Sequence, residues 1–224
     1  MNKQILKINN LSYRYSDALE DEFVLKDINY SFETGKVYAI KGKSGSGKTT
    51  LLSLISGLES NYQGSIKFLD KELKDIDLDY YRSRDIGIVF QSYNLLPHLT
   101  ASENIILSMN ISNLKIENKE EKALSLMEQV GLTKEQKDRR VLKLSGGEQQ
   151  RVAIARSLSY NSKMILADEP TGNLDKETEN EILKIFKDLA HKDNKCIIIV
   201  THSENVCDQA DIVFELTKTK KKRS

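Results

Sequence analysis

Three short, uninterrupted apolar runs dictate much of the architecture of this chain. They read IGIVF at 86–90, MILA at 164–167 and CIIIV at 196–200. Runs of this length without polar alternation are typical of parallel strands that are buried on both faces. Helical segments lie between them, and the last of these segments has a single apolar face. That face consists of Ile182, Leu183, Phe186, Leu189 and Ala190. The sequence therefore predicts an α/β fold in which helices cover a parallel sheet.

The segments before and between these runs read differently. Up to residue 40 the chain favours strands, because Leu11, Tyr13 and Tyr15 alternate with polar neighbours and 24–40 is broken by a Glu-Thr-Gly turn. A helix at 49–57 ending at Gly57 and a strand at 65–69 follow. We expect a helical insertion at about 92–157. The sequence as a whole shows no internal repeat and no linker. Thr100 with Glu103 predicts the start of one helix, and Asn118 with Glu121 the start of another. The second helix would end at Gly131, and its apolar face would consist of Ala123, Leu124, Met127 and Val130.

Composition excludes several classes of protein. The 34 Lys and Arg residues against 33 Asp and Glu leave a net charge of +1, so no global basic field attracts nucleic acid. The apolar runs are far shorter than the ~18 residues of a membrane span, and no apolar segment follows the N-terminal lysines as in a signal peptide. Cys196 and Cys207 form no CxxC pattern. We expect a cytoplasmic protein with reduced thiols.

A glycine-rich loop lies between a strand at 37–41 and a helix at 49–56. It reads GKSGSGKT at 42–49 and matches the P-loop pattern, in which curled backbone N–H groups bind nucleotide phosphates. Lys48 would add a positive charge to the β- and γ-phosphates, and the Thr49 hydroxyl would ligate Mg²⁺. The predicted nucleotide contacts here are Gly42, Lys43, Ser44, Gly45, Ser46, Gly47, Lys48, Thr49 and Thr50.

Polar residues end the three apolar strands, where ligands bind in parallel α/β sheets. Asp168 and Glu169 are adjacent carboxylates, a costly pair unless a cation or proton relieves their repulsion. Beside a P-loop, Asp168 would hold Mg²⁺ and Glu169 would polarise the attacking water as general base. Gln91 would hold Mg²⁺ or water, and His202 would sense the γ-phosphate. Each of the last two, taken singly, is more often an ordinary polar loop residue, and it is their matched positions at strand ends that favour the functional role.

Two further features point to a nucleotide. Tyr15 would stack on adenine, although Tyr15 and Tyr13 share a strand face and either can be simply packed. LSGGEQQ at 144–150 is a second glycine turn that opens a helix, and such a helix start also attracts anions.

Taken together, GKSGSGKT, FQ at 90–91, LSGGEQQ, ILADEP at 165–170 and VTH at 200–202 resemble the ATP-binding cassette (ABC) family. The resemblance implies that two copies stack head to tail, with ATP and Mg²⁺ as cofactors. Ser145, Gly146 and Gly147 of one copy would then contact the ATP held by the other. Asp175, in the NLD segment at 173–175, would lie where the two sites communicate.

The resemblance also implies an ABC-ATPase fold of the P-loop NTPase class over 1–224. We expect a mostly parallel core sheet and an N-terminal antiparallel β-subdomain at about 1–91 and 158–216, a helical subdomain at about 92–157, and a basic tail at 217–224. The tail is either a solvated terminus or weakly attracted to anionic lipid. Val141 replaces a proline that is frequent in the family, and the usual Asp-Gly turn after the final strand is missing.

The segments 90–105, 150–158 and 167–175 are similar to ATPases that serve lipoprotein release and the export of macrolides or antimicrobial peptides. We therefore expect a Mg-dependent ATPase on the inner face of the cell membrane. Its partners would be an integral permease, an extracytoplasmic accessory protein and a second copy of itself, but no nucleic acid. Residues 93–99 would either grip the permease or pack inside the helical subdomain. The alternative function is an ATP-gated regulator of a division or cell-wall complex that moves no solute.

Overall fold

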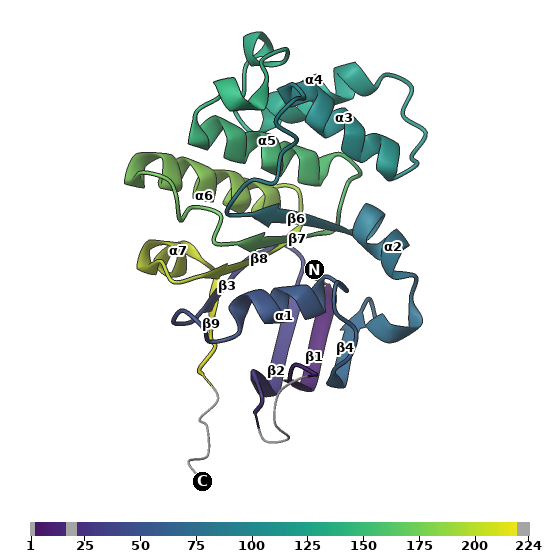
Figure 1. Ribbon diagram of the computed structural model, residues 1–224, viewed down its shortest axis with the longest axis vertical. Coiled ribbons are helices and arrows are strands. Elements are labelled where there is room, and N and C mark those ends of the chain that lie inside the picture. The colour runs from purple at the N-terminus through teal and green to yellow at the C-terminus, as the bar shows by residue number, and fades with distance from the viewer. Residues whose placement is uncertain (1–2, 17–21, 219–224) are drawn as a thin grey trace.

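The computed structural model describes residues 3–16 and 22–218. Within them, the chain forms two sheets and a group of helices that are stacked along the long axis of the molecule (Figure 1). The strands are β1 (Gln4–Tyr13), β2 (Leu25–Glu33), β3 (Lys36–Lys41), β4 (Gln63–Phe68), β5 (Lys71–Glu72), β6 (Ile86–Phe90), β7 (Met164–Asp168), β8 (Cys196–Thr201) and β9 (Ile212–Glu215). The helices are α1 (Lys48–Ile55), α2 (Leu78–Tyr80), α3 (Ala101–Ile111), α4 (Lys119–Gln129), α5 (Gly146–Leu158), α6 (Lys176–His191) and α7 (Glu204–Gln209). Shorter helical turns are η1 (Leu73–Asp75), η2 (Tyr81–Asp85), η3 (Lys134–Gln136) and η4 (Val141–Lys143).

The central sheet has the order β6-β7-β8-β3-β9, and all of its pairs are parallel. β8 is buried at every position, as its unbroken apolar sequence predicts. The second sheet, in the order β2-β1-β4-β5, is antiparallel. The α/β fold with a parallel and an antiparallel sheet is therefore confirmed.

Two apolar clusters fill the two sides of the central sheet. One joins the sheet to α1 and the antiparallel strands, so that α1 lies between the two sheets (Figure 1). The other joins the opposite face to α6 and to the helices α3, α4 and α5. Helices α3, α4 and α5 form the helical part of the molecule. They pack around the second cluster and project beyond α6 (Figure 1).

Most element boundaries follow the predicted signals, and two expectations need correction. Thr100 caps α3 with Glu103, Asn118 caps α4, and Gly131 adopts a positive φ after its end. On α4, however, Leu126 is buried and Leu124 only half-buried, because the buried face follows i, i+3 and i+4 spacing from Ala123. Strand β1 ends at Tyr13, so the predicted alternation does not extend to Tyr15.

No helix among the described residues is long and apolar enough to cross a membrane. Cys196 and Cys207 are both unpaired and buried. Burial raises the pKa of the Cys207 thiol above its ordinary value of 9.0, so this thiol is protonated at neutral pH. Both cysteines therefore act as small core residues.

Candidate functional site

The glycine-rich loop connects the end of β3 to the start of α1 and curls around a lysine. Gly47 precedes α1 with a φ of 95°, a conformation that a side chain would strain. Lys48 is buried, and its Nζ donates to the carbonyl oxygens of Gly42 at 2.8 Å and Lys43 at 3.4 Å. α1 has no side-chain cap, and the residues of its first turn, Lys48, Thr49 and Thr50, line the loop cavity. The arrangement is suited to bind phosphate groups.

Glu169 is held at this cavity by groups from two other segments. Its Oε1 lies 3.5 Å from Lys48 Nζ and 2.9 Å from His202 Nδ1. Its Oε2 accepts from the backbone N–H of His202 at 3.2 Å. The glutamate is placed by a left-handed turn with φ 46° directly after β7. The ends of β7 and β8 thus bring the predicted base and the predicted sensor into contact.

Asp168 occupies the last position of β7, close to the start of α1. Burial raises the pKa of its carboxyl above the ordinary value of 3.8, and the charge of Glu169 adds to this effect. A hydrogen bond with Thr49 and the charge of Lys48 act in the opposite direction. A cation next to Asp168 would relieve the cost of its ionised form.

The oxygen groups at this point fit Mg²⁺. Asp168 and Thr49 supply a carboxylate and a hydroxyl close to one another. The described part of the chain contains no cluster of three or more His, Cys, Asp or Glu side chains that forms a cage. One carboxylate and one hydroxyl fit a nucleotide-bound Mg²⁺, because such an ion takes few protein ligands and completes its shell with phosphates and water.

A cavity of about 550 Å³ unites most of the predicted residues. It is lined by Lys43, Ser44, Gly45, Gly47, Lys48, Thr49, Thr50, Gln91, Glu169 and His202. Gln91 reaches it from the end of β6, and its Nε2 donates to Asn173 Oδ1 at 3.2 Å. Ser46, within the loop, does not line the cavity, and its buried Oγ has no hydrogen-bond partner among the described residues. Residues from four separate segments therefore converge on one space.

The two candidate tyrosines occupy different environments. Tyr13 is buried within the antiparallel sheet, and its hydroxyl donates to Glu59 at 3.3 Å. Tyr15 is 49% exposed and packs edge-on against Tyr13 with ring centroids 5.3 Å apart. Its hydroxyl lies 3.0 Å from the Thr50 hydroxyl, beside the phosphate cavity. Only Tyr15 of the pair offers an accessible ring next to the glycine loop.

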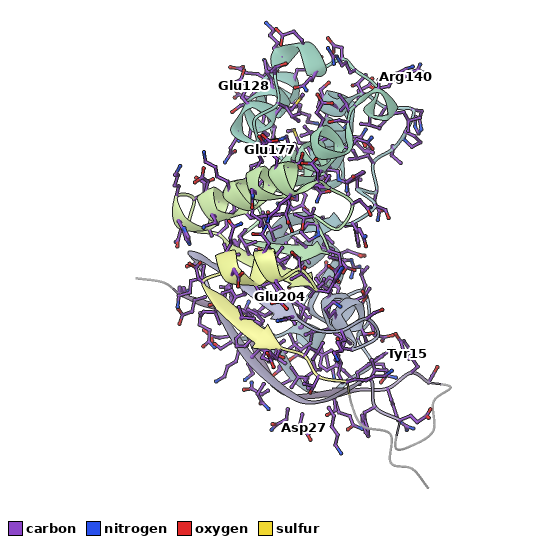
Figure 2. The ribbon with its side chains drawn as sticks, turned by 90° about the vertical axis from the view of Figure 1, so that its left-hand side faces the viewer. Tyr15, Asp27, Glu128, Arg140, Glu177 and Glu204 are labelled. Atoms are coloured by element: carbon purple, nitrogen blue, oxygen red, sulfur yellow. The ribbon has the colours of Figure 1, made fainter. Side chains whose placement is uncertain are left out.

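The second glycine turn lies away from this cavity, at the start of α5. Ser145 caps α5 by accepting from the Glu148 N–H at 3.2 Å. Asp175 caps α6 in the same way, and the hydrogen bond from the Thr178 N–H lowers the pKa of its carboxyl. Figure 2 shows Arg140 in the helical part and Tyr15 toward the opposite end of the molecule. The turn itself lies beside α6, where Gly147 faces Thr178. None of Ser145, Gly146, Gly147 and Asp175 is among the described residues that line the cavity.

Sequence reasoning missed a carboxylate that connects two loops of the site. Glu179 of α6 accepts from the hydroxyls of Thr171 and Ser203, each at 3.0 Å, and from Asn205 Nδ2 at 2.9 Å. Thr171 lies two residues after Glu169, and Ser203 directly follows His202. The helical periodicity identified only the apolar face of α6, and nothing in it marks a polar residue for such contacts.

Residues 93–99 combine both predicted environments. Tyr93 and Leu95 pack against the core of the helical part, whereas Leu96 is 39% exposed. Val141, at the position of the unusual valine, is buried in η4. Of the basic tail, residues 219–224 lie outside the described residues.

Comparison with known proteins agrees with this geometry. A family profile described as "ABC transporter" matches residues 25–172. The ABC transporter ATP-binding protein YclH of Bacillus subtilis is 44% identical, over 96% of this chain and 94% of that protein. The lipoprotein-releasing system ATP-binding protein LolD of Treponema denticola is 41% identical, over 97% of each. A dimeric structure of the ATP-binding cassette MJ0796 in a post-hydrolysis state, bound to ADP and Pi, superposes with a TM-score of 0.86 at 33% identity, over 96% of this chain and 97% of that one. The chain therefore belongs to the ABC transporter family, as one of its ATP-binding subunits.

Proposed function

We propose that this subunit hydrolyses Mg-ATP as a head-to-tail homodimer and powers a membrane permease. The observation that carries the proposal is the position of Glu169. Its carboxylate is fixed between Lys48 and His202 at the cavity of the phosphate loop. A carboxylate held beside a phosphate site is placed to accept a proton from an attacking water.

The other residues take complementary roles. Lys48 and the loop N–H groups would hold the β- and γ-phosphates, and Tyr15 would stack on the adenine. Thr49, Asp168 and Gln91 would hold Mg²⁺, which supplies charge neutralisation for the phosphates. His202 orients Glu169 through its Nδ1 and would contact the γ-phosphate, as its exposed ring can reach beyond the cavity edge.

A second copy of the chain would complete each site. Ser145, Gly146 and Gly147 lie outside the cavity of their own chain, in agreement with a role toward a partner's ATP. The dimeric form of a related cassette supports this arrangement. Asp175 would lie where the two copies cross. Its side chain caps α6, so it is hydrogen-bonded to the first turn of that helix. An isologous C2 dimer satisfies this reciprocal pairing.

The membrane side of the proposal depends on the relatives. Similarity to a lipoprotein-releasing system supports an extrusion system for lipoprotein, peptide or antimicrobial, with an accessory protein on the outer side. The permease would anchor the subunit to the inner face of the cell membrane. Leu96, exposed in the 93–99 segment, is the apolar side chain that we assign to the permease contact. Co-purification of a permease with the subunit, lost in Leu96→Asp, would test this assignment.

The decisive experiment uses Glu169→Gln. We expect this variant to bind Mg-ATP, to shift from monomer to dimer in light scattering, and to lose ATP turnover, because the amide cannot accept the proton. Glu177→Gln, at an exposed carboxylate of α6 outside the cavity, is the matched control and should keep turnover. Wild-type hydrolysis should cease when EDTA removes Mg²⁺. Undiminished hydrolysis by Glu169→Gln would exclude this residue as the base.

A further inference from the structure

A chain of hydrogen bonds connects the loop after α4 to the start of α5. The backbone N–H of Thr133 donates to Gln136 Oε1 at 2.6 Å. Gln136 Nε2 donates to Glu148 Oε1, and Glu148 Oε2 accepts from the backbone N–H of Ser145 at 2.6 Å. Two side chains that each close the first turn of their own helical segment are thereby joined to one another.

The order of donors and acceptors in this series of hydrogen bonds is fixed at both ends. The N–H groups of Thr133 and Ser145 are donors only, so each end requires an acceptor atom. The central contact requires one donor and one acceptor. One amide paired with one carboxylate meets all three requirements, in either order. Two amides place NH₂ against NH₂ in the centre, and two carboxylates place oxygen against oxygen.

The electrostatic surroundings keep Glu148 in its charged, acceptor-only form. The hydrogen bond from the Ser145 N–H lowers the pKa of the Glu148 carboxyl below its ordinary value of 4.5. Partial burial opposes this effect, while the Ser145 hydroxyl, Gln136 and the charge of Arg139 reinforce it. A charged acceptor also strengthens both of its hydrogen bonds.

We propose that Gln136 is a positioning residue that, through Glu148, sets the orientation of the Ser145 turn toward the ATP of a second copy. The inference rests on the proposed function, because the turn has this role only in a head-to-tail dimer. Ser145 is the first residue of the turn, and its N–H is held by Glu148 while its hydroxyl caps α5. A loop distant in sequence from the phosphate loop thus becomes part of the ATP-dependent interface.

The test exchanges the two side chains in the Glu169→Gln background. Gln136→Glu alone and Glu148→Gln alone each break the central contact, and the double exchange restores it in reverse order. We expect each single variant to weaken Mg-ATP-dependent dimerisation about tenfold, the effect of one lost charge-assisted hydrogen bond. The double exchange should recover most of the parent's dimer affinity. ATP affinity, measured at protein concentrations below the dimer dissociation constant, should stay unchanged in all variants.

Two further variants make the result unambiguous. Gln136→Ala removes the donor without adding a negative charge, and it replaces Gln136→Glu if thermal unfolding shows that the latter does not fold. Glu103→Gln alters the corresponding residue in the cap of α3 and should leave dimerisation unchanged, since an amide oxygen can still accept from the Thr100 N–H.

The possible failures are distinguishable. A Glu169→Gln parent that stays monomeric with Mg-ATP would overturn the proposed function and this inference with it. A parent that dimerises, with single variants of equal dimer affinity, would overturn the inference alone. A double exchange whose dimer affinity is no higher than that of the single variants would also overturn the inference. It would show that the order of donors and acceptors between Gln136 and Glu148 does not matter.

Discussion

Gly147 has a structural reason to be glycine that is separate from anion binding. A Cβ at this position would lie 2.5 Å from Cγ2 of Thr178, on the neighbouring helix α6. The hydroxyl of Thr178 donates to Asp175 Oδ2 at 2.7 Å, so this contact reaches the cap of α6. The start of α5 and the start of α6 are therefore packed together by the absence of one side chain.

We expect Gly147→Ala to destabilise the nucleotide-free protein by about 1–3 kcal/mol, the usual cost of an overpacked contact. Thr178→Ser should restore most of the free energy of unfolding, because it removes Cγ2 and keeps the hydroxyl for Asp175. Urea denaturation of both single variants and the double variant measures the effect. Equal destabilisation in the Gly147→Ala and double variants would show that the Thr178 methyl group is not the obstacle.

At the scale of elements, Glu179 connects the loops that follow β7 and β8. Its Oε1 accepts from Thr171 and Ser203, and its Oε2 accepts from Asn205. These loops also carry Glu169 and His202, whose mutual contact depends on the distance between the two strand ends. Glu179 thus supports the site from α6 without lining its cavity.

We expect Glu179→Ala to lower kcat for ATP hydrolysis about tenfold with little change in KM, since small displacements of a catalytic group cost rate and the phosphate loop is untouched. Glu179→Gln should have a smaller effect, because its single oxygen can still accept from both hydroxyls. Steady-state ATPase assays and thermal unfolding separate the two roles of the residue. A fall in stability with unchanged kcat would mean that Glu179 does not position Glu169.

The sequence predicted individual elements well where a local signal decides them. The caps of α3 and α4 and the turns at Gly57 and Gly131 follow from side-chain chemistry and φ alone. The burial of Leu126 in place of Leu124 depends on which side of α4 meets its neighbours, so periodicity alone left this face ambiguous. The contacts of Glu179 and the link from Gln136 to Glu148 arise from tertiary packing, for which one sequence carries no local signal.

At the scale of the whole molecule, the parallel sheet could be predicted because three of its strands, β6, β7 and β8, contain uninterrupted apolar runs. The convergence of Gln91, Glu169 and His202 followed from their positions at strand ends. The strand order β6-β7-β8-β3-β9 could not be predicted from these patterns. In particular, β9 pairs with β3 at the edge of the sheet, and its burial alternates instead of being continuous. A side chain outside any strand adds to the pairing at this edge.

Asp211, directly before β9, connects this edge to β3 and to the end of α6. Its Oδ2 accepts from the Val37 N–H at 2.7 Å and lies 2.9 Å from His191 Nε2, while its own N–H donates to the Val37 carbonyl at 2.9 Å. Partial burial alone would raise the pKa of the Asp211 carboxyl. The Val37 N–H and His191 outweigh it, so the pKa lies below its ordinary value of 3.8.

A carboxyl whose pKa is lowered by folding contributes stability above its unfolded pKa, and this contribution is lost as the pH falls through the folded pKa. We therefore expect Asp211→Asn to reduce the free energy of unfolding at pH 7 by about 1 kcal/mol, a modest value because the group is partly solvated. The difference from wild type should persist down to about pH 4 and shrink below it, as wild-type Asp211 becomes protonated. Denaturant titrations between pH 7 and pH 3 measure this, with Asp208→Asn on the exposed side of α7 as the control. A deficit that stays constant over the whole range would contradict the electrostatic explanation, since the loss would then come from packing and not from the charge that holds β9 to β3.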